Sequence, residues 1–237
     1  MSKIFLDFQK QTQTFNSTMK KILILAIAAC SSVAFAQKGK KVKLFDGKTT
    51  TGWHTWHETT VKGWHAMGGV LMSHGGNGDL VTDKEYENFE LTFEFMAAPK
   101  GNSGVIYKVI ETPELKSSYM SGPEYQIIDD KNYPDPIKDV QKTAANYDMQ
   151  PANDLTIVKP AGEWNKGKIL VNDNHVEHWL NGKKVVEYEY GSTDWQTMVG
   201  KSKFADWEFA KAHAKGKIAL QDHGDMVSFK NIKIKEL

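Results

Sequence analysis

Short runs of apolar and other strand-forming residues, separated by turn residues, recur along the chain beyond residue 41. The run 88–97 is typical, because its phenylalanine and leucine side chains fall on one face and its glutamate and threonine side chains on the other. That alternation predicts a strand with one buried face. Gly68-Gly69 and Asn181-Gly182 separate pairs of such runs and predict tight hairpins. The one helical pattern covers residues 202–214, where aromatic residues form a modest apolar stripe.

Many short strands separated by turn residues, with almost no helix, predict an all-β fold. The expected arrangement is a sandwich of two antiparallel sheets. No repeat or low-complexity linker interrupts residues 41–237, so we expect a single domain there. The 237 residues are 40% hydrophobic and 25% charged, which is typical of a soluble globular protein. The net charge of +1 gives no indication of nucleic-acid binding.

The strand predicted within residues 122–130 carries the clearest chemical signal. Because side chains alternate along a strand, Glu124, Gln126 and Ile128 share one face, while Tyr125 and Ile127 share the other. An acid beside an amide makes a poor core face. The pattern favours either the floor of a cleft for a polyhydroxylated ligand or a solvent-facing row on an edge strand.

The N-terminal segment has the features of an export signal. Met19-Lys20-Lys21 is a basic start, residues 22–29 are apolar, and Ala34-Phe35-Ala36 is a cleavage site before Gln37. Residues 1–18 are polar, which suggests that translation begins at Met19. The apolar run is too short to span a bilayer. We therefore expect residues 1–36 to be the signal of an exported protein without a transmembrane segment.

Cys30 is the only cysteine, which excludes an internal disulfide and a multi-cysteine metal site. It follows Ile27-Ala28-Ala29, a context that resembles a bacterial lipoprotein box. Two alternatives stay open. The mature protein is either released into the periplasm or medium after cleavage, or anchored at the cell surface by a lipid on Cys30.

Several phrases of the mature sequence occur together and in order. They are Leu44-Phe45-Asp46-Gly47, Asn102-Ser103-Gly104-Val105-Ile106-Tyr107, Glu124-Tyr125-Gln126-Ile127-Ile128-Asp129, Lys159-Pro160-Ala161-Gly162-Glu163-Trp164-Asn165, His178-Trp179-Leu180-Asn181-Gly182, Leu220-Gln221-Asp222-His223-Gly224 and Phe229-Lys230-Asn231-Ile232. Together they resemble the 3-keto-disaccharide hydrolase family over essentially the whole mature chain. The resemblance implies a concanavalin-A-like jelly roll with a carbohydrate cleft. It also implies an oligosaccharide or glycoside substrate that is already oxidised to a ketone at sugar carbon 3.

The chemistry implied by the resemblance starts from that ketone, which acidifies the proton on carbon 2. A base removes the proton, the glycosidic oxygen leaves by elimination, and water then adds. No cofactor is required, although the fold is compatible with a structural calcium or other divalent ion. The sequence departs from the family pattern at Lys108, where arginine is usual, and lysine lacks the planar fork of a guanidinium.

Glu124 is the candidate general acid/base, with a structural hydrogen-bonding role as the alternative. Jelly-roll glucanases carry acids at alternate positions of one strand, whereas the next position on this face is Gln126. Glu124 therefore lacks a same-strand partner for hydrolysis by two carboxylates. One acid/base with donors for a developing enolate fits better, and the amide of Gln126 would bind sugar hydroxyls.

The remaining candidates each have a structural alternative. His223 is a candidate proton carrier or a member of a turn-stabilising network with Asp222, itself a candidate substrate contact. Asn102 and Lys108, predicted on one face of the preceding strand, are further candidate substrate contacts. Lys108 either stabilises the enolate oxygen or is a surface lysine. The last two substrate-binding candidates are His178, whose alternative is a buried core position, and Trp164, which could stack on a sugar ring.

Two other functions compete with the enzyme. A non-catalytic carbohydrate-binding module can use the same fold, and so can an interaction domain of a surface complex. The three hypotheses differ in an observable way, since only the enzyme turns over a 3-keto-glycoside, and the interaction domain neither binds nor cleaves sugars.

Overall fold

The computed structural model describes residues 39–237. The strands of this part of the chain are β1 (Lys41–Lys43), β2 (Trp53–Thr55), β3 (Trp64–Met67), β4 (Val70–Ser73), β5 (Leu80–Thr82), β6 (Phe89–Ala97), β7 (Asn102–Val109), β8 (Glu124–Ile128), β9 (Asn165–Asn172), β10 (His175–Leu180), β11 (Lys183–Glu189), β12 (Lys217–Leu220) and β13 (Val227–Glu236). The helical elements are α2 (Thr193–Val199) and the 3-10 turns η1 (Ser118–Met120), η2 (Asp139–Gln141) and η3 (Glu208–Lys211).

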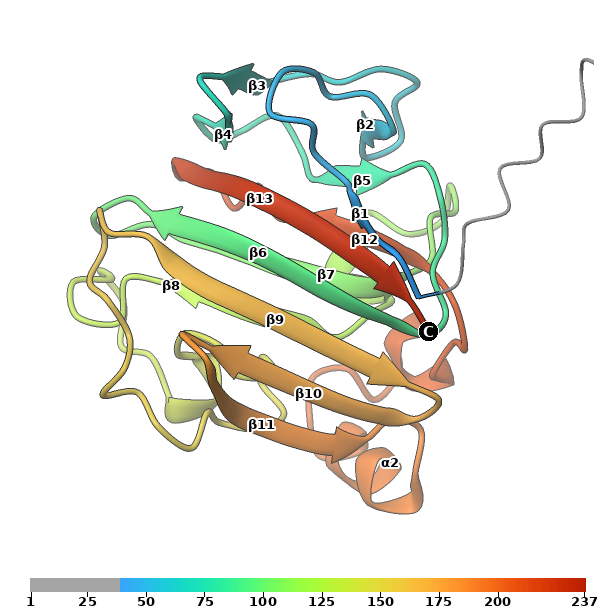
Figure 1. The fold of residues 1–237 in the computed structure, drawn as a ribbon. Coiled ribbons are helices and arrows are strands. Elements are labelled where there is room, and N and C mark those ends of the chain that lie inside the picture. Colours follow the sequence, from blue (N-terminus) through green and yellow to red (C-terminus); the bar gives the residue numbers. More distant parts are fainter. Residues whose placement is uncertain (1–38) are drawn as a thin grey trace, which may run out of the picture. The chain divides into compact units, whose positions relative to one another are not determined.

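The strands form two antiparallel sheets, which confirms the predicted fold class. The larger sheet has the order β11-β10-β9-β6-β13-β4-β3, with β1 also paired to β13. The smaller sheet has the order β2-β5-β12-β7-β8. In Figure 1 the long strands β13, β6, β9 and β10 run across the front, and β7 and β8 lie behind them. The two predicted hairpins are present as β3-β4 and β10-β11.

Aromatic side chains from both sheets meet in the core between them. Phe93 and Phe95 of β6 contact the ring of Tyr125 on β8 edge to face, with centroids 5.3 and 6.1 Å apart. β6 alternates buried and half-buried residues along its whole length, as the sequence pattern predicts. Tyr125 and Ile127 are fully buried in the same cluster. The inner face of β8 is therefore fixed by packing, and its other face carries the polar residues.

The strand β8 lies at one edge of the smaller sheet, and a loop continues the hydrogen bonding beyond it. The backbone N–H of Gln126 donates to the carbonyl of Ala145 at 3.1 Å, and the N–H of Ala144 donates to the carbonyl of Gln126 at 2.8 Å. Tyr125 and Asn146 form an isolated bridge in the same loop. The backbone of β8 is thus paired on both sides, which holds Glu124 and Gln126 on a rigid element.

The prediction of a helix at residues 202–214 is wrong. The α-helix is α2, which begins after the cap residue Ser192, whose side chain accepts from the N–H of Trp195. Residues 202–214 form turns and the short η3 instead. Phe204 stacks on Phe209 with centroids 4.4 Å apart, and Phe209 stacks on Trp195 of α2. The apolar stripe in the sequence reports this aromatic packing between turns rather than a helical face.

The predicted export signal and Cys30 lie outside the described residues. Within residues 39–237, no helix has the length and apolar character needed to cross a bilayer.

Candidate active site

A cavity of about 230 Å³ opens over the polar face of β8. It is lined by Asn102, Tyr119, Glu124, Gln126, Tyr147, Lys203, Phe204, Trp207, Gln221 and His223. A second cavity of about 190 Å³ shares Tyr119, Gln221 and His223 with it and reaches Trp56, Asp79 and Asp222. The structure therefore brings four of the predicted residues, Asn102, Glu124, Gln126 and His223, to one cavity. It places a fifth, Asp222, in the adjoining one.

Glu124 has room in this cavity because its diagonal neighbour on the next strand is a glycine, Gly104. The next strand β7 pairs Gly104 with Gln126 and Ile106 with Glu124. A Cβ atom on Gly104 would lie 2.2 Å from the Glu124 Oε1 atom and 2.7 Å from its carboxyl carbon. Any larger residue at position 104 would displace the carboxyl group. The phrase Asn102-Ser103-Gly104 thus supplies the space that the acid occupies.

Burial makes Glu124 a weak acid. Glu124 is only 7% exposed to solvent. The pKa of the Glu124 carboxyl is raised to about 8, mainly by desolvation and also by the negative charge of Asp79, while Lys203 opposes both effects. A carboxyl group with this pKa is mostly protonated at neutral pH, yet about a tenth of the molecules carry the carboxylate at pH 7. It can donate or accept a proton near physiological pH.

Asp79 is a second buried acid in the adjoining cavity, and the sequence analysis missed it. It is 8% exposed, it accepts a hydrogen bond from the Ser118 hydroxyl, and its Oδ1 accepts from the backbone N–H of Asp222 at 2.8 Å. Burial raises the pKa of Asp79, while these donors lower it. Its place at the end of the glycine-rich run 74–78 was the available signal. From the sequence alone, this run indicates only a loop, because the residue that holds it in place is distant in the sequence.

The anchor of this loop is Asp222. Its carboxylate accepts from the N–H groups of Gly76 and Asn77 at 2.8 and 3.0 Å and from the Ser73 hydroxyl at 3.0 Å. It also accepts from the N–H of Gly224 at 3.0 Å. These bonds give Asp222 a loop-anchoring role beside the cavity, while its neighbour His223 is exposed and lines both cavities.

Three polar atoms at the cavities are buried and have no hydrogen-bond partner among residues 39–237. They are Asn102 Oδ1, Gln221 Oε1 and Trp56 Nε1. Buried polar groups are nearly always hydrogen-bonded in folded proteins. Two acceptors and one donor left free in this way are suited to the hydroxyl groups of a sugar.

Aromatic side chains and one lysine line the cavity together with β8. The ring of Trp207 lies 5.9 Å from that of Tyr119 and 5.4 Å from that of Phe204. The Lys203 ammonium lies 4.3 Å from the centre of the Tyr147 ring and 3.7 Å from Asp148. Lys203, Phe204 and Trp207 come from the turns at residues 202–214, where the sequence pattern predicted a helix, so their approach to β8 could not be predicted from that pattern.

The structure places Lys108 away from the cavity. Ile106 pairs with Ala219 and Val109 with Lys217, so β7 has one extra residue between these pairs. This bulge, with a φ of 56° at Lys108, breaks the alternation that had grouped Lys108 with Asn102. The ammonium instead donates to the carbonyl oxygens of Glu87 and Ala214. Burial lowers the pKa of Lys108 to about 8.

His178 lies in the core between the sheets. It is fully buried, and its ring nitrogens face the Tyr107 hydroxyl at 2.9 Å and the carbonyl oxygen of Ala144 at 3.0 Å. The Tyr107 hydroxyl is also hydrogen-bonded to Tyr188. Burial lowers the pKa of His178 to about 4, so the ring is neutral. Of the two alternatives for His178, the core position is the one the structure shows.

Trp164 also lies outside both cavities. It is half-buried, and the Lys230 ammonium of β13 sits 3.9 Å from the centre of its ring. Because Lys230 belongs to the larger sheet, Trp164 covers that sheet rather than the cavity over β8.

Within residues 39–237, one group of side chains has the spacing of metal ligands. It consists of His175, Glu177 and Glu187. The Lys184 ammonium already lies 3.2 Å from Glu177 and 2.6 Å from Glu187, so a cation neutralises these carboxylates. One imidazole and two carboxylates do not fit a structural Ca²⁺, because this ion takes six to eight oxygen ligands.

Comparisons with known proteins show the family to which the chain belongs. The family model described as the 3-keto-alpha-glucoside-1,2-lyase-like domain matches residues 40–235. A 3-keto-disaccharide hydrolase of Bacteroides thetaiotaomicron is 35% identical over 227 residues, which covers 83% of this chain and 78% of the relative.

Solved structures give the same answer for the fold. A candidate glycosyl hydrolase of Parabacteroides distasonis superposes with a TM-score of 0.80 and 41% identity, and the match covers 84% of this chain and 94% of that one. A Bacillus subtilis protein with a galectin-like fold superposes with a TM-score of 0.50 at 12% identity over 84% of this chain and 97% of that one, which concerns the fold alone. By its sequence match from residue 40 to residue 235, the chain belongs to the 3-keto-alpha-glucoside-1,2-lyase-like family, which confirms the predicted resemblance.

Proposed function

We propose that this protein cleaves 3-keto-glycosides in the cavity over β8, with Glu124 as the acid/base. The observation that carries the proposal is the buried carboxyl group of Glu124, whose pKa is raised to about 8 in a cavity lined by sugar-binding groups. The name of the Bacteroides thetaiotaomicron relative supports the substrate class. Export of the protein, inferred from residues 1–36, belongs to the same proposal.

The proton on sugar carbon 2 is the group that Glu124 acts on. The ketone at carbon 3 acidifies this proton, and a carboxylate with a pKa near 8 is a stronger base than an ordinary glutamate. Removal of the proton leaves an enolate on the carbon-3 oxygen. The electron pair then expels the glycosidic oxygen from carbon 1, and this oxygen takes up a proton as the bond breaks. The sugar is left with a double bond between carbons 1 and 2.

Water completes the cleavage when it adds to this product, with its hydroxyl on carbon 1 and a proton on carbon 2. The sum of the two steps is hydrolysis, and release before the water adds makes the reaction a lyase. Lys203 is the cation that stabilises the enolate in this proposal, because it lines the cavity and its charge acts on Glu124. Exposed His223 is positioned to exchange protons with the leaving oxygen.

The direct test is incubation of the protein with a 3-keto-glucoside and with the unoxidised glucoside, followed by mass analysis of the products. We expect cleavage of the keto substrate alone, because only the ketone acidifies carbon 2. A product 18 mass units lighter than the hydrated sugar would identify elimination without water addition. If the protein bound both sugars without any turnover, the enzyme hypothesis would be wrong, and the result would support a non-catalytic carbohydrate-binding module.

Gly104→Ala should reduce turnover of the 3-keto-glucoside by about tenfold or more, since small misplacements of a catalytic group are costly. The new Cβ would overlap the Glu124 carboxyl group at 2.2 Å and force it to move. The matched control is Gly200→Ala, where the nearest atom is 3.5 Å away in ordinary contact. Equal turnover in Gly104→Ala, wild type and the control would show that the position of the Glu124 carboxyl group is irrelevant to the reaction.

A further inference from the structure

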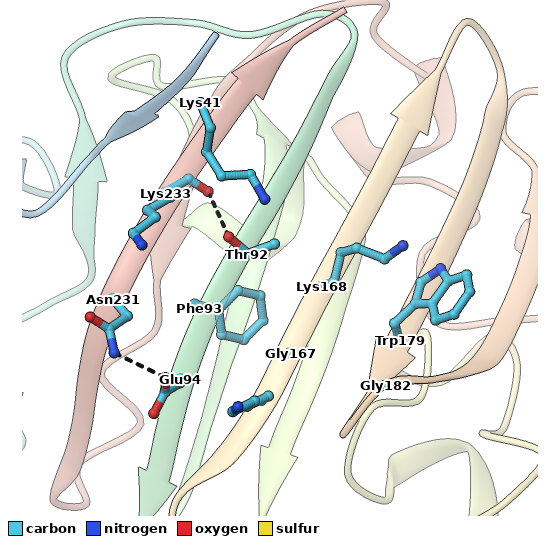
Figure 2. Close-up of a pocket in the computed structure, with 11 residues that line it drawn as sticks. Lys41, Thr92, Phe93, Glu94, Gly167, Lys168, Trp179, Gly182, Asn231 and Lys233 are labelled. Atoms are coloured by element: carbon cyan, nitrogen blue, oxygen red, sulfur yellow. Dashed lines mark hydrogen bonds between the residues drawn. The ribbon is translucent and has the colours of Figure 1, made fainter. Parts of the chain in front are cut away.

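A groove of about 580 Å³ lies on the outer face of the larger sheet, away from the candidate active site. Figure 2 shows its residues, which come from β1, β6, β9, β10 and β13. Four lysines line it, Lys41, Lys166, Lys168 and Lys233, against one acid, Glu94. The groove is therefore strongly cationic in a chain whose net charge is only +1.

The strand register shows that the cations form one row across the sheet. Directly paired residues place Lys43 beside Lys233, Lys233 beside Thr92, and Thr92 beside Lys168. Lys168 is paired in turn with Trp179 of β10. Side chains of directly paired residues share a face, so from Lys43 to Trp179 this row contains three lysines, a threonine and a tryptophan without any carboxylate.

The two neighbouring rows have a different composition. On one side, Glu94 lies between Lys230 and Lys166. On the other side, the Glu90 carboxylate forms an ion pair with the Lys41 ammonium at 2.8 Å. Both neighbouring rows therefore contain a carboxylate beside their lysines. In the central row Lys43 and Lys233 stand directly opposite each other without an ion-pair partner among the described residues, an arrangement that destabilises a sheet. An unfavourable arrangement of this kind favours a ligand that neutralises it.

One end of the row is held in position by its aromatic residue. The Lys168 ammonium lies 3.6 Å from the centre of the Trp179 ring. The indole N–H donates to Glu177 at 2.7 Å, which fixes the ring. Lys168 is thus positioned by a cation–π contact while its ammonium keeps its hydrogen-bond donors for another partner.

We propose that this groove binds an acidic glycan chain, with carboxylate or sulfate groups on Lys168 and Lys233 and a sugar ring at the edge of Trp179. The cationic row is one residue wide, and Glu90 and Glu94 border it on both sides. A single chain with one acid group per sugar fits that width, whereas the two phosphate backbones of a nucleic-acid duplex would meet the carboxylates. The inference does not depend on catalysis in the cavity over β8.

The test measures binding of polygalacturonate, with neutral dextran as the uncharged control. Lys168→Glu/Lys233→Glu should lower affinity for polygalacturonate by about tenfold or more, and wild-type binding should weaken steeply as salt rises. The matched control Lys48→Glu/Lys138→Glu makes the same change of net charge at two exposed lysines outside the groove. It should retain binding within about twofold, since the effect depends on position as well as charge.

Thermal unfolding separates lost binding from lost folding. Lys233 is paired with Lys43, so Lys233→Glu replaces the repulsion between two lysines with an attraction. The melting temperature should therefore stay level or rise. Equal losses in both double variants would reduce the effect to net charge and overturn the proposal. Equal affinity for oligothymidine and polygalacturonate would also overturn it, because the groove would then recognise charge without sugar.

Discussion

Glu124→Gln should abolish turnover of a 3-keto-glucoside, with a fall in kcat of about 10²- to 10⁴-fold, the usual contribution of a positioned general acid/base. The amide keeps the size and hydrogen-bonding shape of the side chain but cannot take the carbon-2 proton. Sugar binding should be retained, because the free polar atoms of Asn102, Gln221 and Trp56 are unchanged. Turnover by mass analysis and binding by calorimetry check the two halves.

The control for this experiment is Glu163→Gln, which makes the same chemical change at an exposed position outside both cavities. It should leave kcat and KM at wild-type values. If Glu124→Gln kept full turnover, another group would remove the proton, and the role assigned to Glu124 would be wrong.

The same substitution should stabilise the protein at neutral pH, by at most about 3 kcal/mol, since each pKa unit corresponds to about 1.4 kcal/mol. The pKa of Glu124 is about 8 in the folded protein, against the ordinary value of 4.5 for a glutamate side chain. Between these values the folded state binds more protons than the unfolded state, so wild-type stability falls as pH rises from about 4.5 to about 8. Glutamine has no such dependence, and the difference should vanish near pH 4.

Melting curves of Glu124→Gln and wild type at pH 4, 5.5, 7 and 8 measure this effect. The gain should reach several degrees at pH 8, since 1 kcal/mol shifts the melting temperature of a domain of this size by about 2–4 °C. Glu163→Gln should track the wild type at every pH. A constant loss of stability in Glu124→Gln would mean that the carboxylate is stabilised in the folded protein, contrary to its desolvated environment.

The floor of the candidate site could be predicted because it depends on strand alternation alone. Tyr125 and Ile127 are apolar and pack in the core, which leaves Glu124 and Gln126 no other face. The two sheets could be predicted for the same reason, since period-two patterns and glycine-containing turns are local features of the chain.

The positions that sequence reasoning misplaced depend on departures from that regularity. Lys108 follows the alternation until a bulge adds one residue to β7, and nothing in its neighbours shows where the extra residue falls. His178 was left open between core and site, and its partner Tyr107 is 71 positions away in the sequence.

The cavity walls were missed for a related reason. Asp79, Lys203 and Trp207 are brought to Glu124 by loops whose course depends on long-range contacts. The aromatic residues between 204 and 209 carry an apolar pattern that a helix and a set of packed turns share. The helix and the packed turns are distinguished only by the long-range contacts that bring these loops together over β8.

The pairing of β8 with residues 144–146 has a consequence for the behaviour of the protein at high concentration. A sheet margin with free N–H and C=O groups can recruit a strand from another molecule, and such recruitment seeds aggregation. Here the loop occupies those groups along Tyr125 and Gln126. The acid-bearing strand therefore stays with its own chain, and the protein can keep a buried carboxyl group at the rim of a sheet without becoming self-associating there.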